Sequence, residues 1–164
     1  MTRAWRKPCA LLAVVCACAS PTRAHSDPEA DFHAHLGRKW ELASLGDRKI
    51  PPPPPGTPRD LPGKDLVPGR RPTIRFNADP RGAGGRSFCN GYGGPYVTHA
   101  DSLRIDRIES SAVGCDGSDS LETRFFRGLR ETRRFEIDSL SLVLITANGL
   151  RLTFVPAEAD SIVQ

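Results

Sequence analysis

Two cysteines, Cys89 and Cys115, carry the most definite chemistry in this 164-residue sequence outside its N-terminal leader. In an oxidising compartment two cysteines most simply form one disulfide, which here closes a loop of about 26 residues and contributes about 3.5 kcal/mol through the chain entropy of the unfolded state. A nucleophilic Cys89 is the alternative, because Asn90 follows it and His99 lies near it along the chain. Nothing in the sequence fixes the Cys-His geometry that such a nucleophile requires. We therefore predict a disulfide between Cys89 and Cys115.

Ser87, His99 and Asp101 have the residue types of a hydrolytic triad and lie close together along the chain. No nucleophile elbow or oxyanion feature accompanies them, so their spacing gives little support to acyl-transfer chemistry. The run Gly82–Gly85 has the composition of a phosphate-binding loop, but no Gly-Lys-Ser/Thr follows it and no helix opens behind it. We expect no catalytic residue and no enzymatic activity.

Three histidines, His25, His33 and His35, are the candidate metal ligands. The segment 25–37 that contains them is poor in apolar residues, so we expect it to be a flexible polar arm. Imidazoles on a mobile arm form no preorganised site, because tight metal binding requires ligands that are held in place. We expect no metal and no other cofactor.

The leader accounts for the basic character of the sequence. Lys and Arg number 23, Asp and Glu number 19, and the net charge is +4. Residues 1–24 contain four basic residues and no acid, so the rest of the chain is electrically neutral. This balance excludes a basic surface for nucleic acid and a polybasic patch for membranes.

Residues 1–24 have the organisation of a signal peptide. Basic residues precede the apolar stretch Cys9–Ala19, and Thr22-Arg23-Ala24 resembles a small-x-small cleavage site. The apolar stretch is too short to span a membrane. The alternative is a lipoprotein leader over 1–17 with an acylated Cys18, because Val15–Cys18 loosely matches a lipobox. We expect an exported protein, periplasmic or secreted, or alternatively a lipoprotein whose only membrane contact is its lipid anchor.

Alternating apolar and polar residues predict short strands along the rest of the chain. Strands are predicted at 40–45, 73–77 and 103–108, and the glycine-rich stretch 79–85 is predicted to be a turn. Many prolines make 50–72 a proline-rich insertion that lacks the amide donors of a helix or a central strand. We interpret it as an exposed insertion, and the alternative is a polyproline ligand for an aromatic groove.

One helix is predicted to begin near Asp119. This residue is spaced as an N-terminal cap, and Glu122 is its expected partner three residues later. Leu121, Phe125 and Leu129 recur every four residues and form an apolar stripe. Arginines interspersed with acids occupy the opposite side, which is typical of a solvated helix face.

The end of the chain predicts a β-hairpin. The apolar run Leu140–Ile145 and the alternating segment Leu150–Phe154 flank Asn148-Gly149, the favoured pair for a type I′ turn. The segment 38–157 is long enough to bury one modest core, so we predict one domain. Strands, one helix and a closing hairpin predict an α+β fold class, with a strongly curved antiparallel sheet and one packed α-helix.

Four segments of the sequence resemble the META domain, the HslJ-like family of bacterial exported and heat-shock-associated proteins. They are Trp40–Leu42, the Cys-Asn-Gly-Tyr core within Phe88–Tyr96, the segment Ser110–Cys115, and the helix with the final hairpin. The resemblance implies a half-open antiparallel β-barrel with one helix, a signal or lipoprotein leader, and no established catalytic activity. The chain departs from the family pattern at Phe88, where Gly is usual, and at 112–114.

The Cys-Asn motif has two interpretations. In the first it is structural: Asn90 shapes a bend, and the aromatic residues around it belong to the core. In the second, Phe88, Asn90, Tyr92 and Tyr96 form the rim of an apolar ligand pocket in the mouth of the barrel.

The resemblance also sets our expectation for function. We expect a monomeric, non-enzymatic envelope protein that acts in stress tolerance, such as heat shock, by binding an envelope partner or by stabilising an envelope component. The alternative is a carrier or chaperone for a hydrophobic ligand or lipid held in the half-open barrel.

Overall fold

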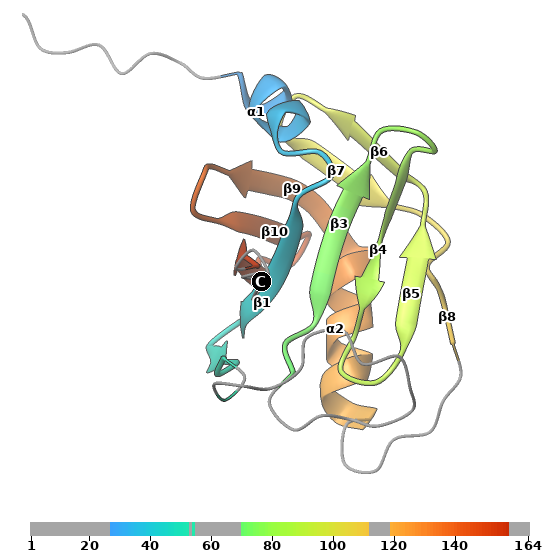
Figure 1. Cartoon of the computed structure of the whole chain (residues 1–164), viewed down its shortest axis with the longest axis vertical. Helices are drawn as coiled ribbons and strands as arrows, with labels where there is room; N and C mark the ends of the chain where they lie inside the picture. The colour runs from blue at the N-terminus through green and yellow to red at the C-terminus, as the bar shows by residue number, and fades with distance from the viewer. Residues whose placement is uncertain (1–26, 53, 55–69, 112–118, 158–164) are drawn as a thin grey trace, which may run out of the picture.

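The structure, a computed structural model, describes residues 27–52, 54, 70–111 and 119–157. Within these residues eleven strands form one curled antiparallel sheet, against which two helices pack (Figure 1). The elements are α1 (Pro28–Ala34), β1 (Lys39–Leu45), β2 (Arg48–Lys49), β3 (Thr73–Asn77), β4 (Gly82–Arg86), β5 (Gly91–Gly94), β6 (Tyr96–His99), β7 (Ser102–Ile105), β8 (Glu109–Ser110), α2 (Asp119–Glu131), β9 (Thr132–Ile137), β10 (Leu142–Thr146) and β11 (Arg151–Pro156).

The first strand lies in the middle of the sheet. β1 pairs with β11 on one side and with β3 on the other, so the first and the last strand of the sequence lie side by side. The full pairing order is β6-β7-β9-β10-β11-β1-β3-β4-β5-β8, and β2 pairs with β1 outside this path. All of these pairs are antiparallel.

One bent hairpin joins the two ends of this order. β5 continues into β6 through Pro95, and β7 continues toward β8, so one half of the hairpin pairs with β4 and the other half with β9. The corner requires Gly94, where a Cβ atom would lie 2.5 Å from the carbonyl oxygen of Asp106. The β7–β9 pairing is short and centres on Ser102 and Arg134. The sheet is therefore a half-open antiparallel β-barrel, as predicted.

Aromatic side chains fill the barrel in two clusters. The first cluster lies beneath α1 and contains Phe32, Phe76, Tyr96 and Phe135. The second cluster lies beneath α2 and contains Tyr92, Phe125 and Phe126, with Phe88 at its margin. Buried leucines from β1, β7, β10 and β11 complete the core around both clusters.

α2 confirms the predicted helix and its apolar stripe. Phe125 and Leu129 are completely buried, and the arginines on the other side of the helix are exposed. Gly128 also faces the sheet, and a Cβ atom at this position would lie 2.8 Å from Leu152 Cδ1 on β11. The absence of a side chain at Gly128 therefore allows the helix to approach the strand closely.

The prediction of a flexible arm over 25–37 is wrong where the structure describes it. Residues 28–34 form α1, which Asp27 caps by accepting a hydrogen bond from the Glu29 amide at 3.0 Å. The side chain of Phe32 is only 1% exposed and lies in the first aromatic cluster. One buried aromatic ring thus anchors a segment whose polar composition is typical of a tail.

Gly82–Arg86 forms β4, so the predicted glycine-rich turn is shorter and covers only 78–81. The glycines serve packing between strands here. A Cβ atom at Gly84 would lie 3.0 Å from the Tyr92 carbonyl oxygen, and one at Gly85 would collide with the Thr73 carbonyl oxygen.

The final hairpin is confirmed, but its turn is not type I′. Gly149 has a φ of +83°, Asn148 does not have a positive φ, and the Gly149 amide donates to the Thr146 carbonyl at 3.0 Å. This is a three-residue loop with glycine in the left-handed position. The side chain of Asn148 shapes the loop by accepting from the Thr146 hydroxyl at 2.6 Å.

Most of the proline-rich insertion, residues 53 and 55–69, lies outside the described residues. The exposure of that part stays a prediction. Its two ends are held together on the sheet. Ile50 is buried and its carbonyl accepts from Arg71 Nε at 3.0 Å, while the Pro72 carbonyl accepts from the Leu42 amide at 2.8 Å. The insertion therefore leaves and re-enters the barrel next to β1.

Candidate functional site

The loop between β4 and β5 contains the Cys-Asn motif, and Ser87 organises it. The Ser87 amide donates to the Asn90 carbonyl at 2.7 Å. The Ser87 hydroxyl accepts from the Asn90 amide at 2.8 Å and from the Cys89 amide at 3.3 Å. A serine that bonds backbone amides two and three residues ahead stabilises a tight turn. The turn holds Cys89 and Asn90 in fixed positions.

Glu122, in the first turns of α2, reaches this loop from across the barrel. Its carboxylate accepts from the Asn90 amide at 3.1 Å and from Asn90 Nδ2 at 3.2 Å on each oxygen. The Ser87 hydroxyl also contacts Glu122 Oε1, and Asn90 Oδ1 accepts from the Ser111 hydroxyl at 2.9 Å. Glu122 is only 8% exposed, and no Lys or Arg of the described chain forms an ion pair with it. A buried carboxylate is thus satisfied entirely by uncharged donors.

The sequence predicted a different role for Glu122, as the partner of an Asp119 cap, and the side chain of Asp119 lies outside what the structure describes. Asp119 is the first residue of α2, and the Glu122 side chain bonds to the β4–β5 loop. A signal for this was present in the sequence. Glu122 lies three, four and seven residues before Phe125, Phe126 and Leu129, which puts it on the buried face of the helix.

The four residues proposed as a pocket rim do not surround one hollow. Tyr92 packs against Phe125 with ring centroids 5.6 Å apart, and its hydroxyl donates to the Thr73 carbonyl at 2.8 Å. Tyr96 belongs to the first aromatic cluster, and its hydroxyl donates to the Asn77 carbonyl at 3.1 Å. Burial raises the pKa of both phenols, so they remain protonated donors.

The other two members of that set also have structural contacts. Phe88 is half-buried and meets Phe125 edge-on, with ring centroids 6.2 Å apart. Asn90 is buried and bonded to Glu122. This geometry favours the structural interpretation of the motif, because its polar groups bond one another and its rings pack in the core.

The comparison with known families agrees with this arrangement. The profile of the META domain family matches residues 34–159. The chain belongs to the META domain family. The predicted resemblance is therefore confirmed, and no curated protein sequence matches the chain.

Solved structures share the fold of this META domain protein. One is an NMR structure of a protein from Burkholderia xenovorans, 19% identical, with a TM-score of 0.58 over 95% of this chain and all (100%) of that one. Another is the crystal structure of a DUF4847 family protein from Bacteroides vulgatus ATCC 8482, 16% identical, with a TM-score of 0.51 over 78% of this chain and 98% of that one. At these identities the likeness concerns the fold alone.

The predicted disulfide and the predicted lipidation each involve a cysteine outside the described residues. Cys89 is half-buried in the β4–β5 loop, whereas Cys115 and Cys18 lie outside the described residues. The disulfide and the lipidation therefore stay predictions. No helix in the described segments is long and apolar enough to cross a membrane.

The structure gives Ser87, His99 and Asp101 separate partners. Ser87 is buried against Glu122, whereas Asp101 forms an ion pair with Arg134, with 2.8 Å between Asp101 Oδ2 and Arg134 Nη2. His99 is exposed at the end of β6. In these positions the three side chains are not aligned for proton transfer.

The predicted histidine arm contributes no metal centre to the described part of the chain. His33 is exposed on α1, and His35 Nδ1 lies 2.7 Å from the Asp31 carbonyl oxygen. Among the residues that the structure describes, no group of three or more His, Cys, Asp or Glu side chains is placed to hold a metal ion. His25 falls outside them.

Two hollows lie on the surface of the barrel. One encloses about 470 Å³ where the β1–β2 turn, the β10–β11 turn and α2 meet, and Arg124, Arg151 and Asp47 are among its lining residues. The other encloses about 400 Å³ beside the corner of the bent hairpin, next to Arg107 and Glu109. Both are open and have charged residues in their lining, unlike the apolar pocket of the second interpretation of the motif.

Proposed function

We propose that this META domain protein is an exported, monomeric and non-enzymatic component of the cell envelope that acts in stress tolerance by binding a partner protein. The support is the disposition of its side chains. Aromatic rings fill the barrel, and the polar groups of the Cys-Asn motif bond one another, so recognition falls to the outer surface. A hydrophobic-ligand carrier has less support, because Tyr92 and Tyr96 pack in the core.

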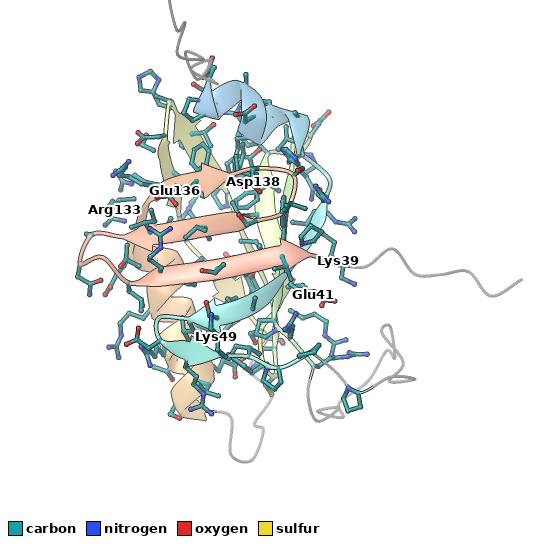
Figure 2. The ribbon with its side chains drawn as sticks, turned by 90° about the vertical axis from the view of Figure 1, so that its left-hand side faces the viewer. Lys39, Glu41, Lys49, Arg133, Glu136 and Asp138 are labelled. Atoms are coloured by element: carbon teal, nitrogen blue, oxygen red, sulfur yellow. The ribbon has the colours of Figure 1, made fainter. Side chains whose placement is uncertain are left out.

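The surface best suited to a partner is the outer face of β9, β10, β11 and β1, here called the outer sheet face. Figure 2 looks onto this face, and α2 lies behind its strands. Charged residues of both signs, Lys39, Glu41, Lys49, Arg133, Glu136 and Asp138, surround it. An antiparallel sheet with one face on the core leaves the other face free for contacts.

The centre of the outer sheet face combines two apolar side chains of β10 with an ion pair. Val143 is only 7% exposed although it lies outside the core cluster, and Ile145 is half-buried two residues further along β10. Arg151 on β11 pairs with Glu136 on β9 across β10, with 2.6 Å between Arg151 Nη2 and Glu136 Oε2. The hydrogen bond to Glu136 raises the pKa of Arg151 above its ordinary value. A face that mixes apolar side chains with charges of both signs has the composition of a typical non-obligate protein interface.

The partner function is tested by site-specific photo-crosslinking in the native host. A crosslinking residue at position 145 is compared with one at Arg127, which is exposed on α2, behind the strands of this face. We expect a defined adduct only from position 145. We also expect Ile145→Glu to abolish both the adduct and rescue of heat tolerance in a deletion strain, while Arg127→Glu preserves both. Equal adducts from the two positions, or full rescue by Ile145→Glu, would contradict the proposal.

Export is tested separately by the intact mass of the protein from membrane and soluble fractions. A chain that begins at His25 in the soluble fraction supports a periplasmic or secreted protein. A chain that begins at an acylated Cys18 in the membrane fraction supports a lipoprotein. A full-length chain that retains Met1 contradicts export.

A further inference from the structure

α1 is attached to the barrel chiefly through one side chain. It lies across one end of the barrel (Figure 1), and Phe32 is its only buried residue. The Phe32 ring lies 5.0 Å from Phe76 on β3, 5.7 Å from Tyr96 on β6 and 4.9 Å from Phe135 on β9, centroid to centroid. These three residues of the sheet are called the aromatic seat.

The remaining attachments of α1 are few. The Glu29 carboxylate accepts from the Ala100 amide at 3.0 Å, in an exposed position. Beyond the helix, Gly37 has a φ of +78°, and its amide donates to the Phe76 carbonyl at 2.7 Å. A helix of seven residues does not persist by itself in water. Release of the Phe32 ring would therefore free α1, whereas Leu36 packs against the core and the His35 ring lies 5.8 Å from that of Trp40, so these two contacts beside Gly37 can remain.

The aromatic seat does not depend on α1 for its shape. Phe76 and Tyr96 meet edge-on at 5.1 Å, and the Tyr96 hydroxyl is fixed by its bond to the Asn77 carbonyl. All three residues stand on paired strands of the barrel. The profile of the META family begins at residue 34, so it includes the seat but almost none of α1.

The margin of the seat carries a positive charge. The Arg81 guanidinium lies over the Tyr96 ring, 5.7 Å from its centroid. α1 carries Glu29 and Asp31 beside Phe32. The seat therefore accepts an aromatic ring that is flanked by acids.

We propose that the aromatic seat is a docking site for a protein segment that presents one aromatic side chain next to acidic residues, and that α1 occupies this site in the free protein. Binding of such a segment displaces α1, which pivots at Gly37. This site is separate from the outer sheet face, so its test does not depend on the function proposed above.

The test uses a labelled peptide with the sequence of residues 27–37 and the complete mature chain. We expect the Phe32→Ala chain to bind the peptide at least about tenfold more tightly than the wild-type chain, in which the tethered α1 competes at high effective concentration. A peptide with alanine in place of its phenylalanine should not bind. The control chain Phe88→Ala, which loses a ring from the other cluster, should behave as the wild type does. Absence of peptide binding to a folded Phe32→Ala chain, or equal binding of both peptides, overturns the proposal.

Hydrogen exchange on the wild-type chain keeps the proposal testable if Phe32→Ala fails to fold. The amides of Asp31 and His35 bond within α1 and at its C-terminal cap. We expect them to exchange through local opening, at least about tenfold faster than the amides of β10. Exchange of α1 as slow as that of β10 would show that the helix does not leave the seat, and would overturn the proposal.

Discussion

The carboxylate of Glu122 on α2 accepts hydrogen bonds from both the backbone amide and the side-chain amide of Asn90 in the β4–β5 loop. One buried acceptor thereby joins the helix to the loop that carries Cys89. Because the bonded groups are buried and uncharged on the loop side, removing the acceptor leaves several donors without partners. The bonds between Glu122 and Asn90 therefore hold this side of the barrel together.

Glu122→Gln should destabilise the protein. The amide group of glutamine places a donor where the loop already presents donors, so at least one charge-assisted bond is lost, at a cost of about 1.5–3 kcal/mol. Urea unfolding measures this change. Glu131→Gln, near the end of the same helix, is the control and should shift the free energy of unfolding by less than about 0.5 kcal/mol. Equal effects of the two substitutions would contradict the role assigned to Glu122.

Gly128→Ala should lower stability although alanine is the better helix former. The gain in helix propensity is about 1 kcal/mol. The new Cβ atom would lie 2.8 Å from Leu152 Cδ1, and Leu152 is completely buried, so α2 or β11 must shift. We expect a net loss of about 1–2 kcal/mol from overpacking, measured by thermal unfolding. The double variant Gly128→Ala with Leu152→Val should regain part of that loss. A stabilised single variant would show that the helix moves away without cost.

Ala100→Gly should raise stability. Ala100 has a φ of +52° in the β6–β7 turn. Relief of about 1–2 kcal/mol of left-handed strain outweighs the extra unfolded-state entropy of glycine, which leaves a gain of about 0.5–1 kcal/mol. Ala147→Gly is the matched control, because Ala147 is also an exposed turn alanine but lacks a positive φ. It should lose stability, and chemical denaturation of both variants decides the matter.

Asp138 should make a small contribution to stability that disappears in acid. Its carboxylate accepts from the amides of Leu140 and Ser141, each at 2.7 Å, and these bonds lower its pKa below the ordinary value of 3.8. A folded pKa below the unfolded one means that the contribution is present above pH 3.8 and is lost as the pH falls through the folded pKa. We expect Asp138→Ala to cost about 0.5–1 kcal/mol at pH 7 and almost nothing at low pH. Asp138→Asn, whose acceptor does not titrate, should show no such pH dependence relative to Ala.

The Cys89–Cys115 pairing can be tested by thiol labelling of the mature chain. The bonds of Asn90 to Glu122 hold the adjacent Cys89 in place, so a bridge from it should be a stable structural link. We expect no maleimide labelling of the unreduced protein and a loss of up to about 3.5 kcal/mol on reduction. The double variant Cys89→Ser with Cys115→Ser should match the reduced protein and be insensitive to reductant. Labelling of both cysteines before reduction would refute the pairing.

Local patterns predicted much of the fold. The strands β1 and β3 and the buried stripe of α2 follow periods of 2 and 3.6 residues, which report which side chains face a core. The same patterns missed α1 and β4. In α1, one buried ring outweighs a polar composition, and in β4, glycines make close contacts between strands, so neither segment shows a periodic apolar signal.

The hydrogen bonds of the candidate site could not be predicted from local patterns, for a different reason. Glu122 stands in line with the apolar stripe of α2, so its burial was readable from its spacing. Its partner Asn90 lies 32 residues earlier, and nothing local to either residue indicates that they meet. The sequence left the structural and the pocket interpretations of the motif open, because it does not show that the bend directs Tyr92 and Tyr96 into different aromatic clusters.

The central position of β1 has a consequence for when this protein folds. Its register joins Trp40 to Pro156 and Leu45 to Leu152, so the first strand cannot complete its pairing until nearly the whole domain has been synthesised. Contacts of such long sequence separation slow folding. For a protein exported through a narrow channel, as proposed here, that delay is useful. Until its C-terminus has left the ribosome, the chain lacks β11, the partner of β1. We therefore expect it to stay unfolded enough to pass through the channel.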